Sequence, residues 1–192
     1  VMTMHRLIPI VYFLFFLINI SGLSQQHEQI MFYNCENLFD TSNDSLTDDD
    51  DFTPTGSYHW TYARYEEKLN HVAKVIIAVG QPEPPMFIGL CEIENEKVLR
   101  ALITKTPLLK YKYRIIHYDS PDKRGIDVAC LYNADKLIVL ESKPIPVVFS
   151  NEPRSKTRDI LYVKGVMNHK DTLVFFVNHW PSRVGGENKT AH

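Results

Sequence analysis

The sequence predicts an α/β layered fold. Residues 62–79 have the apolar spacing of an amphipathic helix and precede the uninterrupted apolar run 86–90, and a helix followed by a buried strand is typical of such folds. From residue 113 onward, short apolar runs alternate with turn sequences, which favours antiparallel strands. The chain has 192 residues, 44% hydrophobic and 23% charged, which suffices for one domain with a buried core.

The first predicted strand and the loop after it come before the helix. Residues 30–33 are apolar without alternation, which indicates a strand buried on both faces. Residues 41–58 are rich in Asp, Thr, Ser, Gly and Pro, which predicts a mobile loop. The acidic part of this loop, Asp44 to Asp51, lacks the spacing of a helical-hand calcium site, so a solvated acidic loop is favoured.

Two helices flank the second predicted strand. Helix 62–79 places apolar residues on one face, and Pro82, Pro84 and Pro85 end it before the run 86–90. Residues 95–106 predict a second helix with an apolar side. The remaining apolar runs predict strands over residues 113–117, 126–132, 137–140, 145–149, 160–167 and 172–178.

The N-terminus has the organisation of a secretory signal peptide. His5 and Arg6 precede the apolar run 7–20, and Gly22 and Ser24 have the spacing of small residues before a cleavage point. A membrane anchor is the alternative, although the run is short for a span. We expect residues 1–24 to be a signal peptide, residues 25–192 to be the domain, and the protein to be exported to the periplasm or the extracellular space.

Charge and cysteine content limit the possible functions. The net charge of −2 gives no global positive field that would attract nucleic acid or an anionic membrane. The three cysteines, Cys35, Cys91 and Cys130, lie in or beside apolar runs, which favours free core thiols. A nucleophilic cysteine is the alternative at Cys35 or Cys91, because each adjoins a candidate functional residue.

Glu92 is the leading candidate for a metal ligand. It follows a strongly apolar run, and a carboxylate is costly to bury there unless it is paired or binds a cation. A hard oxygen ligand of this kind suits Mg²⁺. The alternative is a glutamate that caps the next helix or is exposed, and Glu94 and Glu96 are nearby rivals.

Asn34 and His179 also end apolar runs. The amide of Asn34 can donate to a phosphate oxygen or orient a carboxylate, although Asn is also common in turns. His179 can donate to a phosphate oxygen or transfer a proton, and a structural histidine is the alternative.

Three arginines can clamp an anion with paired donors. Arg124 precedes Gly125, Arg158 follows a threonine, and Arg183 lies beside two glycines. The alternative for each is an ordinary surface arginine. Asp127 lies inside a predicted strand, and we expect it to pair with an arginine.

Four segments, taken in order, resemble the endonuclease/exonuclease/phosphatase superfamily. This superfamily includes deoxyribonuclease I-like nucleases, apurinic endonucleases, inositol polyphosphate phosphatases and bacterial sphingomyelinases, and the similarity is greatest to exported bacterial members. The match covers roughly Ile30 to Gly186. The segments are Asn34-Cys35-Glu36-Asn37-Leu38-Phe39-Asp40, Gly89-Leu90-Cys91-Glu92-Ile93-Glu94-Asn95, Arg124-Gly125-Ile126-Asp127-Val128-Ala129 and Asn178-His179-Trp180-Pro181-Ser182-Arg183.

The resemblance implies a fold and a set of site residues. It implies a four-layered α/β sandwich, with two mixed, largely antiparallel sheets flanked by helices. It implies that Asn34 belongs to the site, that Glu92 binds Mg²⁺ or Mn²⁺, and that His179 contacts the scissile phosphate. The carry-over to Arg124, Arg158 and Arg183 as phosphate-binding residues is less direct.

The family pattern also contains a later Gly-Asp-x-Asn segment and a terminal Asp-His pair, and neither precedes His192. We therefore expect this sequence to be the N-terminal part of a longer protein and to be inactive alone. The resemblance implies a metal-dependent phosphodiesterase or endonuclease in which water attacks phosphorus in line. The alternatives are a phosphomonoesterase, a sphingomyelinase-like lipid phosphodiesterase, or a non-catalytic binding module. We expect a monomer whose partner is a phosphate-ester substrate.

Overall fold

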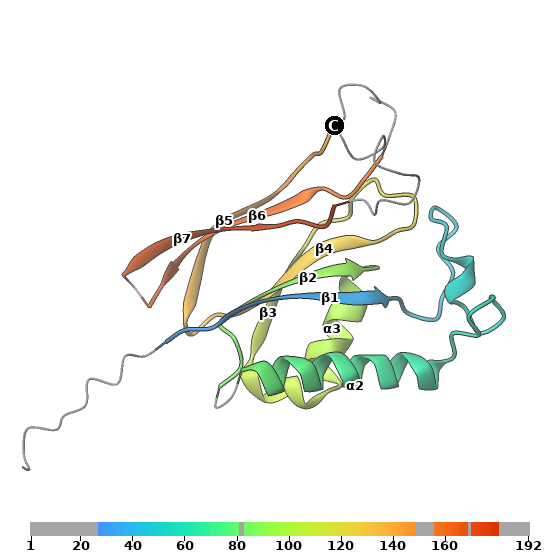
Figure 1. Cartoon of the computed structure of the whole chain (residues 1–192), viewed down its shortest axis with the longest axis horizontal. Helices are drawn as coiled ribbons and strands as arrows, with labels where there is room; N and C mark the ends of the chain where they lie inside the picture. Colours follow the sequence, from blue (N-terminus) through green and yellow to red (C-terminus); the bar gives the residue numbers. More distant parts are fainter. Residues whose placement is uncertain (1–26, 81–82, 149–155, 169, 181–192) are drawn as a thin grey trace, which may run out of the picture.

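The computed structural model describes residues 27–80, 83–148, 156–168 and 170–180, which form two β-sheets with helices on one side (Figure 1). A four-stranded sheet has the order β1-β2-β4-β3, and a three-stranded sheet has the order β5-β6-β7. The elements are β1 (Ile30–Leu38), the 3₁₀ helix η1 (Asp50–Phe52), α2 (Tyr62–Val79), β2 (Phe87–Ile93), α3 (Glu96–Thr104), the 3₁₀ helix η2 (Pro107–Tyr111), β3 (Tyr113–His117), β4 (Asp127–Asn133), β5 (Leu137–Ile145), β6 (Ile160–Met167) and β7 (Asp171–Val177).

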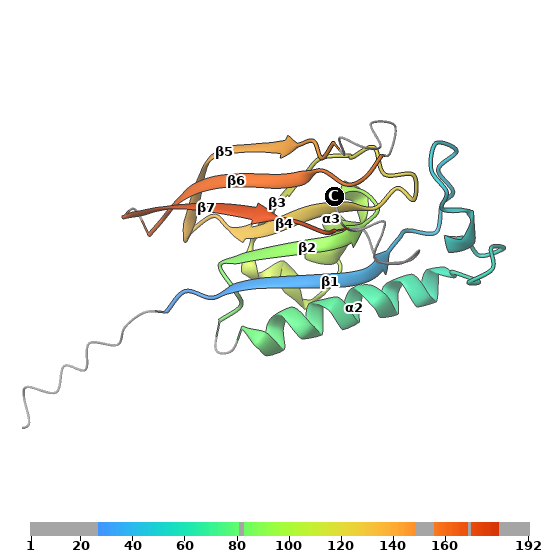
Figure 2. The same ribbon diagram turned by 45° about the horizontal axis from the view of Figure 1, so that its top comes forward.

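The four-stranded sheet is mixed and lies between the helices and the other sheet (Figure 2). β1 and β2 are parallel, whereas β4 is antiparallel to both of its neighbours. One hydrophobic core joins α2 and α3 to one face of this sheet. A second core joins its other face to the three-stranded antiparallel sheet, through side chains such as Phe87, Val128 and Leu161. The predicted two-sheet α/β fold is thus confirmed, and the described residues place helices against the four-stranded sheet.

The two predicted helices are confirmed. Thr61 caps α2 by accepting a hydrogen bond from the backbone N–H of Arg64, and Gly80 follows its last turn. Asn95 caps α3 in the same way, with its side chain accepting from the N–H of Val98. Both caps satisfy N–H groups that have no partner within a helix. The second helix is shorter than the predicted 95–106, because α3 ends at Thr104 and a separate 3₁₀ turn follows.

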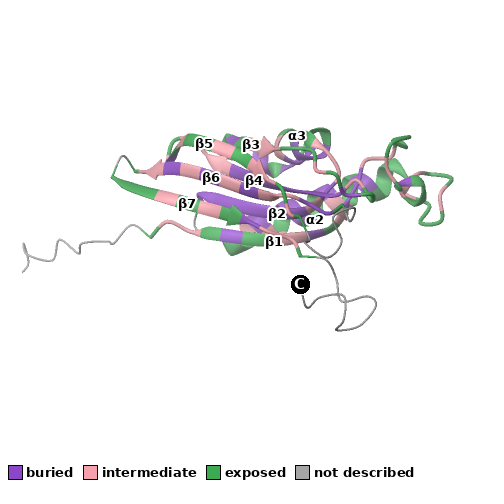
Figure 3. Ribbon diagram, turned by 90° about the horizontal axis from the view of Figure 1, so that it is seen from above, coloured by how far each residue is buried: buried purple, intermediate pink, exposed green. Residues whose placement is uncertain are grey.

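Three strand predictions require correction. Ile30 and Phe32 are 58% and 56% exposed, so β1 is not buried on both faces. The reason is that β1 lies at an edge of its sheet, whereas the three-stranded sheet packs mainly over β2 and β4 and leaves this face of β1 exposed (Figure 3). Residues 137–145 form one strand, because β5 is also an edge strand and tolerates Pro144. Finally, β2 continues past the apolar run, so Glu92 lies inside the strand.

The acidic loop is anchored to the rest of the fold, which its composition did not indicate. Asp49 is 1% exposed and accepts hydrogen bonds from the backbone N–H of Asp44. Phe52 stacks on Phe39 with ring centroids 4.1 Å apart. The indole N–H of Trp60 donates to the Phe39 carbonyl at 3.0 Å. These contacts fix the loop beside the end of β1.

The predicted signal peptide lies outside the described residues. Among the helices that the structure does describe, none has the length and apolar character needed to cross a bilayer.

Candidate active site

Glu92 lies where the regular pairing of β2 with both of its neighbours, β1 and β4, is interrupted. Its φ of 58° lies in the left-handed region, which is unfavourable for a residue with a Cβ. The pairing with β4 shifts between Cys91 and Ile93, and the pairing with β1 shifts between Asn34 and Leu38. A bulge of this kind changes the direction in which a side chain points. Glu92 is accordingly only partly buried, whereas every other residue of β2 is buried.

Three residues from two other chain segments contact the Glu92 carboxylate. Oε1 lies 3.3 Å from the amide nitrogen of Asn34 and 3.3 Å from Nε2 of His179. Oε2 accepts a hydrogen bond from the backbone N–H of Asn37 at 2.9 Å. Asn34 and Asn37 come from β1, and His179 follows β7. The ends of β1, β2 and β7 therefore meet at this carboxylate.

His179 is partly buried and lies among charged side chains of both signs. Burial lowers its pKa most, and the positive charge of Arg158 lowers it further. Glu92 raises the pKa, Arg124 lowers it, and Asp122 raises it, with decreasing effect. The net direction is downward, which favours the neutral imidazole near pH 7.

Two of the three predicted arginines lie around this group. Arg124 donates from Nη2 to the side-chain oxygen of Asn37 at 2.7 Å. Arg158 donates from Nη1 to Asp122 at 3.0 Å, and both of these side chains are 7% exposed. The Nε of Arg158 is buried and has no hydrogen-bond partner in the described part of the chain. The third arginine, Arg183, lies outside the described residues.

The rival glutamates have other partners. Glu94 accepts a hydrogen bond from the backbone N–H of Asp40. Burial chiefly raises the pKa of Glu94 to about 7; the Asp40 N–H opposes this rise, and the charges of Asp40 and Asp49 add to it. Glu96 forms an exposed ion pair with Arg100 on α3. Of the three glutamates, Glu92 is the one that contacts Asn34 and His179.

Asp127 pairs with a histidine, so the expected arginine partner was wrong. Its Oδ2 lies 3.0 Å from Nε2 of His117, and its Oδ1 accepts from the backbone N–H of Ser120 at 2.9 Å. The reason is local: the turn between β3 and β4 returns His117 and Ser120 to the start of β4. Ligand atoms of His117, Asp119 and Asp127 all lie within 4.8 Å of one another.

The cysteines are free and buried, in agreement with the favoured interpretation. Burial raises the pKa of Cys35 and of Cys130, and it raises the pKa of Cys91 to about 12. Thiols in this environment remain protonated and are poor nucleophiles.

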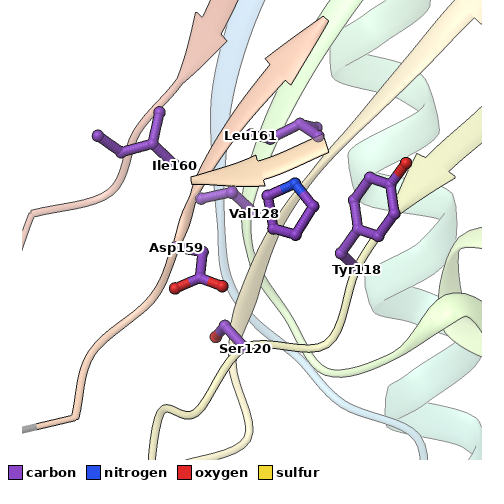
Figure 4. A pocket seen from close by; sticks show the side chains of 7 residues that line it. Tyr118, Ser120, Val128, Asp159, Ile160 and Leu161 are labelled. Atoms are coloured by element: carbon purple, nitrogen blue, oxygen red, sulfur yellow. The ribbon is translucent and has the colours of Figure 1, made fainter. Parts of the chain in front are cut away.

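Two cavities differ in size and lining. One of about 600 Å³ lies between the acidic loop and the β3–β4 loop, and Asp122 and Gly125 form part of its wall. Its other charged lining residues are Asp44, Glu94, Lys97, Asp119, Lys123, Asp127 and Lys156. The other cavity, of about 10 Å³, lies among Tyr118, Ser120, Val128 and Asp159 (Figure 4). It has room for about one water molecule and is too small for a substrate.

Three residues at or near the site had no assigned role from the sequence. Asn37 belongs to the segment Asn34 to Asp40, but no sequence pattern indicates that its backbone N–H donates a hydrogen bond to a carboxylate. Asp122 follows Pro121 in a sequence typical of a turn, and nothing local indicates that Arg158 is its partner. His117 closes the predicted strand 113–117 and resembles any residue at a strand end.

Comparison with known proteins places this geometry in context. The model of the endonuclease/exonuclease/phosphatase family matches residues 29–192. The chain is similar to the crystal structure of ANGEL2, a 2′,3′-cyclic phosphatase, with 11% identity and a TM-score of 0.47 over 76% of this chain and 38% of that one. It is also similar to a functionally unknown conserved protein from Enterococcus faecalis, with 13% identity and a TM-score of 0.45 over 77% of this chain and 50% of that one.

The chain thus spans half or less of the length of these solved structures. No curated protein matches it. Since the family model covers nearly all of the described residues, the chain belongs to the endonuclease/exonuclease/phosphatase family.

Proposed function

We propose that the protein is a divalent-metal-dependent phosphoesterase, and that Glu92 is the metal ligand contributed by this part of the chain. The observation that carries the proposal is the convergence of Asn34, His179 and two arginines on or beside one carboxylate, at a bulge between β1 and β2. Family membership supports the same reaction class.

The donor set at Glu92 fits a hard cation. Mg²⁺ and Mn²⁺ are commonly held by one or two carboxylates together with water. Both contacts to Oε1 are long at 3.3 Å, so this oxygen is only weakly engaged by the protein. A bound cation would neutralise charge on the phosphate and stabilise the transition state.

The protein groups have separate tasks in this proposal. His179 donates a hydrogen bond from Nε2 to a phosphate oxygen, and Arg124 and Arg158 supply positive charge as water attacks phosphorus in line. Asn34 orients Glu92 through its amide nitrogen. The Oδ1 of Asn34 accepts from the backbone N–H of Glu36 at 2.8 Å, which fixes the amide with its nitrogen toward Glu92.

The decisive experiment replaces Glu92 with Gln and measures Mn²⁺ binding and phosphodiester turnover in the full-length protein. We expect weaker metal binding and a rate loss on the order of a thousandfold, because the metal contributes several kcal/mol to charge stabilisation. Glu96→Gln is the matched control, because its ion pair with Arg100 is exposed. Unchanged metal affinity and turnover in Glu92→Gln would falsify the assignment.

The charge of the larger cavity favours one of the alternative substrate classes. Its lining contains five acidic and three basic side chains; Asp122 is paired with Arg158, which leaves four carboxylates against three lysines and thus a small acidic excess. An acidic wall repels the neighbouring phosphates of a nucleic acid and tolerates a neutral or cationic substituent. A phosphodiester with a cationic head group, as in a lipid substrate, is therefore the second candidate.

A comparison of substrates separates the two candidates. A chromogenic phosphodiester carrying choline should be hydrolysed faster than an oligonucleotide of equal phosphodiester concentration if the acidic cavity selects the substituent. A preference for the oligonucleotide would support the nuclease. Absence of hydrolysis of either substrate by the full-length protein would support the non-catalytic binding module instead.

We also propose that the N-terminal segment directs export of the protein. N-terminal sequencing of the secreted protein tests this proposal.

A further inference from the structure

We infer that Asp122 is a positioning residue of the phosphate site: it holds the Arg158 guanidinium beside His179 and fixes the turn that carries Arg124. This inference rests on the proposed function. It assigns a task to a carboxylate that touches neither the metal ligand nor the proposed phosphate position.

Both oxygens of the Asp122 carboxylate are used. Oδ2 accepts from Nη1 of Arg158 at 3.0 Å, and Oδ1 accepts from the backbone N–H of Arg124 at 2.9 Å. The Asp122 carbonyl also accepts from the N–H of Gly125 at 3.1 Å, and Gly125 has a φ of 65°, which favours glycine. One residue thus links a side chain from the segment before β6 to the loop before β4.

The ion pair between Asp122 and Arg158 is buried, so each side chain depends on the other. The Asp122 and Arg158 side chains are each 7% exposed, so each charge needs the other in this environment. The pair is not saturated, however, because Nε of Arg158 has no partner within the described ranges. A buried unpaired donor is unfavourable, so the position of the Arg158 guanidinium depends on its bond to Asp122. The positive charge of the Arg158 that Asp122 holds in place acts on His179, the residue whose Nε2 lies 3.3 Å from Glu92.

The inference is testable because a purely electrostatic role of Asp122 predicts the opposite effect on phosphate binding. A carboxylate near an anion site repels the anion, so removal of Asp122 would tighten phosphate binding if charge alone mattered. If Asp122 positions Arg158, its removal weakens phosphate binding despite the gain in positive charge. The two possibilities predict opposite signs for the same substitution.

The probe is inorganic phosphate, and its dissociation constant is measured by titration calorimetry at constant ionic strength with the full-length protein. We expect Asp122→Asn to weaken phosphate binding about tenfold, the usual scale for the loss of a residue that orients another. Asp135→Asn is the matched control, because it removes the same charge from an exposed side chain at the other end of β4. This control should change the constant by less than about twofold.

A double variant shows whether Asp122 acts through Arg158. The losses of Asp122→Asn and Arg158→Gln should combine to less than their sum, because both remove the same oriented guanidinium. Additive losses, or tighter phosphate binding in Asp122→Asn, would overturn the inference while leaving the proposed function intact. If the unaltered protein binds neither phosphate nor a phosphodiester, the proposed function and the inference both fail.

A second measurement decides the matter if Asp122→Asn does not fold. The Nε–H signal of Arg158 is identified by NMR through its loss in Arg158→Lys. On addition of phosphate to the unaltered protein this signal should shift, while the Nε–H signal of Arg100 on α3 stays in place. An unmoved Arg158 signal at saturating phosphate would contradict the inference.

Discussion

Two carboxylate–histidine pairs have their carboxylates on neighbouring strands, β2 and β4, and differ in burial, in sequence separation and in their neighbours. Glu92 and His179 are 3.3 Å apart and their side chains are 14% and 19% exposed. Asp127 and His117 are 3.0 Å apart and are 5% and 4% exposed. The first pair joins segments 87 residues apart, taking 179 minus 92, and has two arginines around it. The second pair closes one turn, and Ser120 occupies its remaining carboxylate oxygen.

This difference shows that the residue types alone do not mark a site. The Asp127 pair is closed to a ligand, because the side chains of His117 and Asp127 are only 4% and 5% exposed. The Glu92 pair is held by long contacts and is exposed enough to admit a ligand. We therefore expect substitutions at the two pairs to have opposite effects on rate and stability.

Among substitutions of the partners of these two carboxylates, His179→Ala should have the largest effect on rate. The rate of phosphodiester hydrolysis by the full-length protein should fall on the order of a hundredfold, the scale for one transition-state donor. The midpoint of thermal unfolding should barely change, because His179 is partly exposed and follows the end of β7. Steady-state kinetics and a thermal melt check both parts. A large loss of stability with the rate preserved would show that His179 is structural.

His117→Ala should show the reverse pattern. Loss of the imidazole leaves one oxygen of the buried Asp127 without its partner, which destabilises the protein by about 1–3 kcal/mol. The turnover per folded molecule should stay close to that of the unaltered protein. Denaturant unfolding and an assay corrected for the folded fraction test this. If His117→Ala lost activity as His179→Ala does, the two pairs would not be functionally distinct.

Asp119→Asn should have the smallest effect of the series. Its carboxylate is 91% exposed and lies 3.8 Å from Nδ1 of His117, so the pair is well screened by solvent. The free energy of unfolding should change by less than about 0.5 kcal/mol. A larger change in equilibrium denaturation would mean that Asp119 belongs to the closed pair as a third member.

The sequence predicted the elements well, and with them the residues that end strands. The helical spacing over 62–79 and the apolar runs that became β3, β4 and β6 depend on local periodicity, which a single sequence carries. Asn34, Glu92 and His179 were found as polar residues after apolar runs and through the resemblance of four segments. The structure brings these three side chains together, whereas their roles remain predictions.

The misses share a physical cause, which is that partners distant in sequence leave no local trace. The pairing of Asp122 with Arg158 joins residues 36 apart in the chain, and the exposure of Ile30 and Phe32 depends on which strands the other sheet covers. The bulge at Glu92 was missed for a related reason. It arises from the register of β2 against two neighbours, and an isolated strand has no register.

The left-handed backbone at Glu92 also limits how this protein can be stabilised. Glycine adopts a φ of 58° without the Cβ clash that glutamate incurs, so Glu92→Gly removes local strain. A screen that selects for thermal stability alone would thus be drawn to the position that the proposed chemistry needs most. Thermal stability favours glycine at position 92, whereas the proposed catalysis requires glutamate there. An engineered stable variant should therefore keep Glu92 and be improved at other positions.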